Sequence, residues 1–296
     1  MANPDTVYLL DASIYIFRAW FGYPDTIVDK QGRSVNAVLG YWRQLLAGLK
    51  LKRPDRILVA FDESLFSGFR HHLYPEYKAN RALPDDALAY QLFLCRELTD
   101  ALGICTRSSQ VYEADDVLFT AARVARQAGH VVDVVTRDKD LAQIVAPGDC
   151  WSDWHAGQSL DHDQLTARWG VTPPQIPEVL ALAGDAVDNI PGVPQVGLKT
   201  AVSLIQHFGT LENMFGNIEQ IMELPIRGAL KLHRRLQEHQ GQALLFRELV
   251  RLHIADCDIG VQDFAFSPPT SEKITALLNE LALGPAFKRE WERYQE

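Results

Sequence analysis

Short apolar segments alternate with longer stretches of helical periodicity in the first half of the chain. Val7–Leu10, Ile57–Phe61 and Val131–Val135 are short runs rich in apolar residues, which is typical of strands buried on both faces. From Val35 to Leu49 the apolar residues recur at helical spacing and form one stripe that faces a core. Trp151–Trp154 is expected to be a further strand, at an edge of the sheet. Strands that alternate with helices predict an α/β fold with a central, mostly parallel sheet flanked by helices.

The pattern changes after about residue 148, where helical periodicity takes over. A helix is expected to end at Gly170, and beyond Lys199 the chain reads almost entirely as helices as far as Arg251. We therefore predict an α/β part over residues 1–170 and a helical part over residues 171–296, the last two helices included.

The composition is that of an ordinary soluble domain with a real core, with 47% hydrophobic and 23% charged residues among 296. The amino terminus does not resemble a signal peptide, and no apolar run is long enough to span a membrane. The four cysteines show neither metal-ligand spacing nor a disulfide framework, so the cytoplasm is the simplest location. The net charge of −9 taken alone argues against nucleic acid, but it says nothing about where the charges lie.

Seven acidic residues lie where a predicted strand ends or a helix begins. They are Asp11, Asp62, Asp138 and Asp140 after strands, and Glu113, Asp115 and Asp116 at a helix start. One acid at such a position is very often a helix cap. If the strands are parallel, however, all seven converge on one edge of the sheet, where unpaired carboxylates would repel each other. Divalent cations among them would make the cluster favourable, and ligands that are all oxygen indicate Mg²⁺ or Mn²⁺ rather than Zn²⁺.

A glycine-rich stretch over residues 184–201 combines two features of nuclease chemistry. Asp185 and Asp188 are three residues apart, so both carboxylates can face the same way. The following segment, from Gly192 to Thr200, predicts a hairpin that opens a helix, whose free N–H groups suit a phosphate. Each half has a simpler explanation, because acids near loops are usually solvated and glycine hairpins are usually only turns.

Two stretches rich in basic residues are candidates for a nucleic-acid-binding surface. Residues 69–81 interleave basic and aromatic side chains, as single-strand binding surfaces do, although an ordinary surface loop is an equally good explanation. A later basic cluster is either a solvated helix face or a duplex-binding face; it consists of Arg227, Lys231, Arg234 and Arg235.

Together these residues resemble the bacterial and phage 5′-nuclease family, which includes flap endonucleases and the 5′→3′ exonuclease domain of DNA polymerase I. The resemblance runs from Tyr8 to about Val250, and the chain looks like a free-standing member. The motifs that carry it are Leu10-Asp11-Ala12-Ser13, Phe61-Asp62, Tyr74 to Arg81, Glu113 to Asp116, Asp138-Lys139-Asp140 and Gly184 to Val193. Arg137 departs from the family pattern, which has glycine there, and could pair with a carboxylate or contact DNA.

The resemblance implies a PIN-like core, a helical arch at about residues 64–102 and a helix-three-turn-helix module at about residues 184–250. It implies two metal sites, the first formed by Asp11, Asp62, Glu113, Asp115 and Asp116, the second by Asp138, Asp140, Asp185 and Asp188, with Asp115 near both. Lys78 and Arg81 match arch residues that contact the scissile phosphate. The expected DNA contacts are Arg70, Tyr77, Lys78, Arg81, Gly192, Val193, Gly197, Lys199, Thr200, Arg227 and Lys231, and hairpin carbonyls could bind K⁺.

The sequence therefore predicts a Mg²⁺-dependent flap endonuclease and 5′→3′ exonuclease of DNA replication and repair, a monomer that acts on 5′-flap, nicked or branched duplex DNA. Two alternatives remain at this point. One is a junction-binding protein that has kept the acids without catalysis, which the complete acid set opposes. The other is a PIN-like ribonuclease, which the hairpin and the arch cations disfavour.

Overall fold

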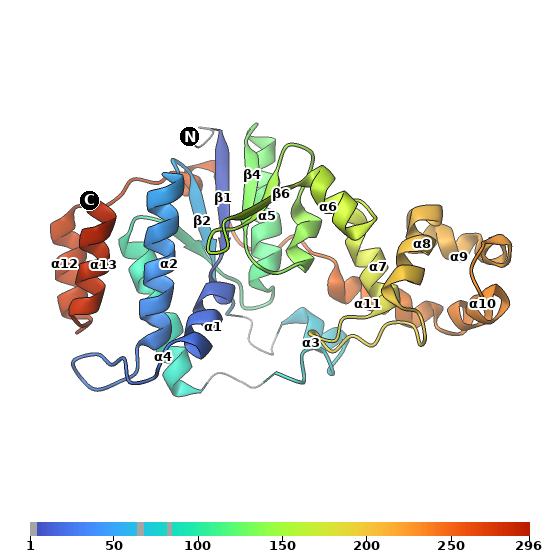
Figure 1. Ribbon diagram of the computed structural model, residues 1–296, viewed down its shortest axis with the longest axis horizontal. Helices are drawn as coiled ribbons and strands as arrows, with labels where there is room; N and C mark the ends of the chain where they lie inside the picture. Colours follow the sequence, from blue (N-terminus) through green and yellow to red (C-terminus); the bar gives the residue numbers. More distant parts are fainter. Residues whose placement is uncertain (1–4, 64–67, 82–84) are drawn as a thin grey trace.

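The computed structural model describes residues 5–63, 68–81 and 85–296, and these form one six-stranded sheet with helices on both faces (Figure 1). The strand order is β3-β2-β1-β4-β5-β6. In that order the strands are Cys105–Arg107, Ile57–Ala60, Thr6–Asp11, Val131–Val135, Cys150–Asp153 and Gln158–Asp161. All neighbouring pairs are parallel except β5 and β6, which are antiparallel. The predicted α/β fold with a mostly parallel sheet is confirmed.

Two details of the sheet differ from the sequence prediction. The short strand β3 was missed, because three residues are too few to give a periodic signal. The segment around Trp151 was expected at the edge, but β5 is an inner strand, since β6 pairs with its outer side. Both errors leave the order of the acid-bearing strands β2, β1 and β4 unchanged.

Alternate strand residues fill two separate cores. Tyr8 and Leu10 of β1 pack toward α1 (Ala12–Gly22), α2 (Asn36–Lys52) and α4 (Asp86–Ala101). Val7 and Leu9 point to the opposite face, which α5 (Ala114–Gln127) covers. This alternation is the expected consequence of the two-residue period of a strand. Of the predicted arch, residues 64–67 and 82–84 lie outside the described residues, whereas α3 (Phe69–Leu73), the turn up to residue 81 and α4 are described.

The helical part extends away from the sheet (Figure 1). After η1 (Asp140–Ile144), β5 and β6, α6 (His162–Trp169) ends the α/β part. The helical part then comprises η2 (Pro173–Gln175), α7 (Ile176–Ala183), α8 (Leu198–Phe208), α9 (Leu211–Gly216), η3 (Ile218–Glu223), α10 (Ala229–Glu238) and α11 (Gln240–Val250). α7 and α8 are joined by the predicted hairpin, which requires glycine at two places. A Cβ atom on Gly192 would lie 2.3 Å from the nitrogen of Gly184, and both residues have positive φ.

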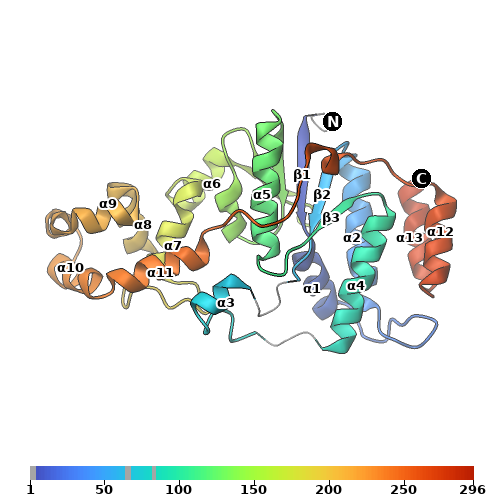
Figure 2. The same ribbon diagram turned by 180° about the vertical axis from the view of Figure 1, so that it is seen from behind.

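The last two helices return to the opposite end of the molecule (Figure 2). The chain passes η4 (Val261–Phe264), pairs Ala265 with Arg56 beside the sheet, and then forms α12 (Ser271–Glu280) and α13 (Pro285–Gln295). The ring of Trp291 packs 6.3 Å from that of Trp42 in α2, whose indole donates to the carbonyl of Phe287. These helices thus stabilise the α/β core and do not join α8–α11, with which the sequence had grouped them. In the described part of the chain no helix has the length and apolar character that a membrane span requires.

Candidate active site

The carboxyl edge of the sheet gathers the predicted acids around a polar cleft. The cleft is lined by Glu113, Asp115, Asp138, Asp140, Asp185 and Asp188, which come from α5, the segment after β4, and the α7–α8 hairpin. Asp11 ends β1 next to this group; its carboxylate accepts from the Ser13 amide at 3.0 Å and from Thr136 Oγ1 at 3.1 Å. The parallel strands have therefore brought together acids that are far apart in the sequence.

The innermost acids hold their protons strongly because they are buried beside one another. Burial, with the charges of Asp138 and Asp62 nearby, raises the pKa of Asp11 to about 7. The pKa of Asp115 is raised by burial and by Asp138 and Asp11, and that of Asp138 is raised mainly by burial. A group of carboxylates that resists ionisation is one that a cation would stabilise.

Asp140 and Asp185 are the two cleft acids that most clearly lack hydrogen-bond partners. Asp140 Oδ1 and Asp185 Oδ2 are both buried, and neither accepts a hydrogen bond from any described residue. The nearest cation is Lys139, whose Nζ lies 3.9 Å from the first oxygen and 3.4 Å from the second. Burial and the neighbouring acids Asp138 and Asp185 raise the pKa of Asp140 to about 9.

Glu113 differs from these acids because cations already surround it. Its Oε1 accepts from Lys78 Nζ at 2.7 Å, and its Oε2 accepts from the Tyr77 hydroxyl at 3.0 Å. Burial alone would raise its pKa, but the charges of Lys78 and Arg70 outweigh burial and lower the pKa to about 2. Glu113 is consequently ionised and paired throughout the neutral range.

The segment with Tyr77 and Lys78 is fastened to the acid-bearing hairpin. The Lys78 amide donates to the carbonyl of Asp188 at 3.0 Å, and the Tyr77 hydroxyl lies 3.1 Å from Asp188 Oδ2. Arg81 reaches Asp188 Oδ1 at 2.6 Å, with 45% of its side chain exposed. Lys78 adopts a positive φ of 52°, which costs a non-glycine residue about 1–2 kcal/mol. Such strain is typical of functional sites.

Three sequence assignments need correction in this light. We expected the Lys78 side chain to reach solvent or phosphate, but it is buried and paired with Glu113. Tyr77 is 2% exposed, so it is not placed to stack on a base. Arg70 is 3% exposed and holds Asp116, so it is not placed on a DNA-facing surface. Alternating charge and aromatic character marked this segment correctly as unusual but could not show which way its side chains point.

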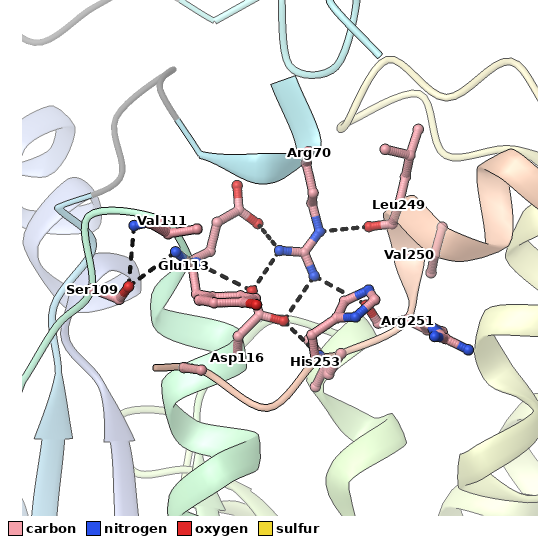
Figure 3. A network of polar contacts seen from close by, with 12 residues as sticks. Arg70, Ser109, Val111, Glu113, Asp116, Leu249, Val250, Arg251 and His253 are labelled. Atoms are coloured by element: carbon pink, nitrogen blue, oxygen red, sulfur yellow. Dashed lines mark hydrogen bonds and ion pairs between the residues drawn. The ribbon is translucent and has the colours of Figure 1, made fainter. Parts of the chain in front are cut away.

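Asp116 also departs from its predicted role as a metal ligand. It is fully buried, and each of its oxygens accepts two hydrogen bonds (Figure 3). Oδ1 accepts from Arg70 Nη2 at 2.9 Å and from the His253 amide at 2.8 Å. Oδ2 accepts from Arg70 Nη1 at 2.5 Å and from the Glu113 amide at 3.1 Å. With both oxygens saturated, this carboxylate organises the start of α5 and is not available to a cation.

Carboxylate oxygens are the ligands that divalent cations such as Mg²⁺ prefer, but these acids are not arranged as a preformed metal site. Within the residues that the structure describes, no three His, Cys, Asp or Glu side chains surround one point closely enough to hold an ion. The buried oxygens of Asp140 and Asp185 without hydrogen bonds, and the raised pKa of Asp140, nevertheless fit hard cations. Arg137, the departure from the family pattern, pairs with Asp153 at 3.0 Å and not with a cleft acid.

The predicted duplex-binding residues lie on and beside the hairpin that leads into α8. Gly197 and Lys199 are exposed and Thr200 is half-buried at the start of α8, whereas Gly192 and Val193 are buried. Arg227 and Lys231 are exposed near α10. A hydrogen bond of 2.5 Å from Arg235 of α10 to Gln195 connects α10 to the hairpin. The exposed cations at the start of α8 and near α10 therefore lie on neighbouring elements.

Comparison with known proteins identifies the family. The family model for the 5′-3′ exonuclease N-terminal resolvase-like domain matches residues 6–170, and that for the 5′-3′ exonuclease C-terminal SAM fold matches residues 171–272. The chain is 31% identical over 285 residues to a 5′-3′ exonuclease of Aquifex aeolicus, covering 96% of this chain and 94% of that protein. The chain belongs to the 5′-3′ exonuclease family. This confirms the resemblance found in the sequence motifs.

Other relatives of this 5′-3′ exonuclease family member are larger or more distant. It is 36% identical over 278 residues to DNA polymerase I of Bacillus caldotenax, and it spans 31% of that protein's length. The bacteriophage T5 D15 flap endonuclease, solved with DNA and metal ions, superposes with a TM-score of 0.65 at 19% identity, over 98% of this chain and 100% of that one. The catalytic core of Rad2 with DNA substrate gives 0.64 at 16% identity, over 97% and 90%. These structures establish the fold.

Sequence reasoning missed several residues that shape the site. Thr136 bonds Asp11 and also accepts from the Asp138 amide, so it links two strand ends. Lys139 is the cation beside Asp140 and Asp185. Its place within the Asp-Lys-Asp motif was a usable signal. Gln143 had no such signal, because the partners that give it a place in the site, Val250 and Leu252, lie more than 100 residues away.

Proposed function

We propose that this chain is a divalent-metal-dependent, structure-specific 5′-nuclease that hydrolyses phosphodiester bonds in DNA at 5′ ends and 5′ flaps. The observation that carries the proposal is the convergence of acids at the carboxyl edge of the sheet, with buried oxygens of Asp140 and Asp185 that accept no hydrogen bond. A cleft of this kind in a member of the 5′-3′ exonuclease family supports metal-assisted hydrolysis over passive binding.

The residues that would hold Mg²⁺ or Mn²⁺ are acids that line the cleft, together with Asp11 and Asp62, which lie at and just after the ends of β1 and β2. Asp11, Asp62, Asp115 and Asp138 would serve one ion, and Asp138, Asp140, Asp185 and Asp188 would serve a second. Two such ions would supply an activated water and neutralise charge on the leaving oxygen. Glu113 contributes differently, because its pairing with Lys78 fixes the start of α5, which carries Asp115.

The cations of the arch segment would act on the phosphate. Arg81 is the more accessible one, since its guanidinium is 45% exposed and rests on Asp188 at the cleft rim. Lys78 is enclosed, and its charge balances Glu113, which lines the cleft. Fixed positive charge close to the reacting phosphate stabilises the charge that develops during hydrolysis.

The helical part would hold the duplex through phosphates, which gives affinity for shape and not for sequence. Lys199 at the start of α8, with Arg227 and Lys231 near α10, supplies exposed positive charge, and the α8 amino terminus supplies free N–H groups. Binding of K⁺ by carbonyls of the hairpin, a monomeric state and a cytoplasmic location remain predictions from the sequence.

A labelled 5′-flap incubated with Mg²⁺ or with EDTA tests the proposal directly. We expect cleavage near the flap junction with Mg²⁺ and none with EDTA. Binding without cleavage at any Mg²⁺ or Mn²⁺ concentration would instead establish the junction-binding alternative. An RNA strand of the same sequence, digested in parallel, tests the ribonuclease alternative, which requires RNA to be cut faster than DNA.

A further inference from the structure

Arg70 lies buried where three distant segments meet (Figure 3). Its guanidinium faces Asp116 and Glu113 at the start of α5 on one side and the end of α11 on the other. Nη1 lies 2.5 Å from Asp116 Oδ2 and 3.5 Å from Glu113 Oε2. Nε donates to the carbonyl of Leu249 at 2.7 Å, and Nη2 donates to the carbonyl of Arg251 at 3.0 Å. All three nitrogens of the fork are therefore engaged.

The segment Leu249–His253, which we call the strap, includes the end of α11 and is bound by three side chains of the α/β part. Arg70 holds the carbonyls of Leu249 and Arg251, while Gln143 accepts from the Leu252 amide and donates to the carbonyl of Val250. Asp116 accepts from the His253 amide. Leu249, Val250 and Leu252 also form a wall of the acid cleft. The strap is thus both the end of the helical part and a boundary of the site.

Electrostatics explains why an arginine occupies this place. The last carbonyls of α11 have no partner within the helix and carry the negative end of its dipole, so they favour a cation. The start of α5 presents the carboxylates of Glu113 and Asp116, which need a cation when buried. Arg70 satisfies both needs at once, and only a planar fork with several donors can do so in two directions.

We propose that Arg70 is a positioning residue that couples the placement of the helical part to the placement of the metal-binding acids. α11 packs against α7, which leads directly to Asp185 and Asp188, while α5 carries Glu113 and Asp115. Arg70 connects these two groups of acids through the strap. The inference rests on the proposed nuclease function for its kinetic consequences, but its structural consequences can be measured without cleavage.

The conservative variant Arg70→Lys is the most informative one. Lysine keeps a positive charge near Asp116 and Glu113, but it cannot also reach the carbonyls of Leu249 and Arg251. The matched control is Arg126→Lys at the other end of α5. Arg126 likewise binds a carboxylate and a carbonyl, those of Asp149 and Ile144, but it lies away from the cleft. Arg126 is more exposed than Arg70 and makes fewer contacts, so urea unfolding should show a smaller loss of stability for Arg126→Lys than for Arg70→Lys.

The two variants should differ in every property that depends on positioning. For Arg70→Lys we expect Mn²⁺ affinity, measured by electron paramagnetic resonance on the protein alone, to fall about 10-fold, as for residues that orient metal ligands. Single-turnover cleavage should fall about 10- to 100-fold and recover in part at high Mg²⁺, while flap Kd in Ca²⁺ stays within about 3-fold. Arg126→Lys should leave all three values unchanged.

A measurement on the unaltered protein guards against a variant that fails to fold. Coupling is reciprocal, so saturating Mg²⁺ should slow amide hydrogen exchange in the strap. If exchange in the strap is unaffected by Mg²⁺, or if Arg70→Lys and Arg126→Lys differ from wild type only in stability, the coupling role is overturned. A flap Kd that rises as much as the rate falls would also overturn it and return Arg70 to DNA contact. An unaltered protein that binds Mn²⁺ but never cleaves would defeat the proposed function alone.

Discussion

The acid cleft and the α8–α10 surface use charge in opposite ways. In and beside the cleft, Asp11 and Glu113 are buried and Asp115 is half-buried, and each has a pKa displaced by its surroundings. On the α8–α10 surface, Lys199 and Lys231 are exposed, and within the described residues neither forms an ion pair. Buried charges interact strongly with their neighbours and with whatever enters the site, whereas exposed charges act weakly and through the salt atmosphere.

This difference separates catalysis, which depends on the cleft, from DNA binding, which depends on the α8–α10 surface. Changes in the cleft should alter turnover and stability together, because each carboxylate is part of the local electrostatic balance. Changes on the α8–α10 surface should alter only affinity, and by amounts that depend on salt. The acidic net charge of −9 and a DNA substrate are compatible for the same reason, because the excess acids and the exposed cations occupy different parts of the molecule.

The largest effect is expected for Asp115→Asn. This change removes a carboxylate from the cleft while preserving its shape, so single-turnover cleavage should fall by at least roughly 10²-fold. The pKa of Asp115 is raised by burial and by Asp138 and Asp11, so its ionised form is unfavourable in the folded protein. In EDTA the variant should therefore melt at or above the wild-type temperature. A variant that loses both activity and stability would show that Asp115 is structural.

Lys78 and Arg81 should separate in stability although both contact cleft acids. Lys78→Met leaves Glu113 without its main partner in a buried place and should cost about 3 kcal/mol of unfolding free energy. Arg81→Ala breaks an exposed pair with Asp188 and should cost about 1 kcal/mol or less. Single-turnover cleavage should fall roughly 10²-fold for both if both act on the phosphate.

Urea unfolding and single-turnover kinetics check this pair of variants. The double variant Lys78→Met with Glu113→Gln provides the control, because removing both charges should restore part of the lost stability. Equal stability losses for Lys78→Met and Arg81→Ala would contradict the buried pairing. A normal cleavage rate for Lys78→Met would exclude it from the chemistry.

The sequence predicted the fold and most of the cleft because both depend on short-range signals. Buried strands such as β1 and β4 are continuous apolar runs, and an acid directly after a parallel strand must lie at the carboxyl edge. Which acids are free could not be predicted in this way. Asp116 is saturated by Arg70 and His253, and His253 is 137 residues away, so no local pattern reports the contact. The same holds for Lys78, whose burial depends on the fit of the arch segment against the hairpin.

A pH series in EDTA should reveal the cost in stability of ionising the buried, neighbouring acids of the cleft. The pKa values of Asp11 and Asp140 are raised in the folded protein to about 7 and about 9, above the value of about 4 in an unfolded chain. The folded state then binds more protons than the unfolded state between these limits, so stability must fall as pH rises from 5 to 9. Glu113, with its pKa lowered to about 2, acts in the opposite direction but only below this window.

Thermal melting across this range, with and without Mg²⁺, measures the effect. Without the ion the melting temperature should decline by several degrees toward pH 9, and Mg²⁺ should flatten the decline because it binds the same carboxylates. A melting temperature in EDTA that is constant or rises with pH would mean that the acids are better solvated than their burial indicates.

The smallest effect is expected on the α8–α10 surface, and salt dependence detects it better than affinity. A lysine that neutralises one phosphate releases about one counterion, so replacing Lys199 or Lys231 with alanine should weaken duplex binding modestly at low salt. The slope of log K against log salt should fall by about one unit for each residue that contacts a phosphate.

Lys288→Ala on α13 is the matched control, because Lys288 is exposed but lies on a helix that packs against α2. Since these lysines are remote from the cleft acids, single-turnover cleavage at saturating enzyme should be unchanged in all three variants. An unchanged slope for Lys199→Ala and Lys231→Ala would move the duplex to another face. A slope change for Lys288→Ala alone would place the duplex beside α13, at the opposite end of the molecule from α8–α10.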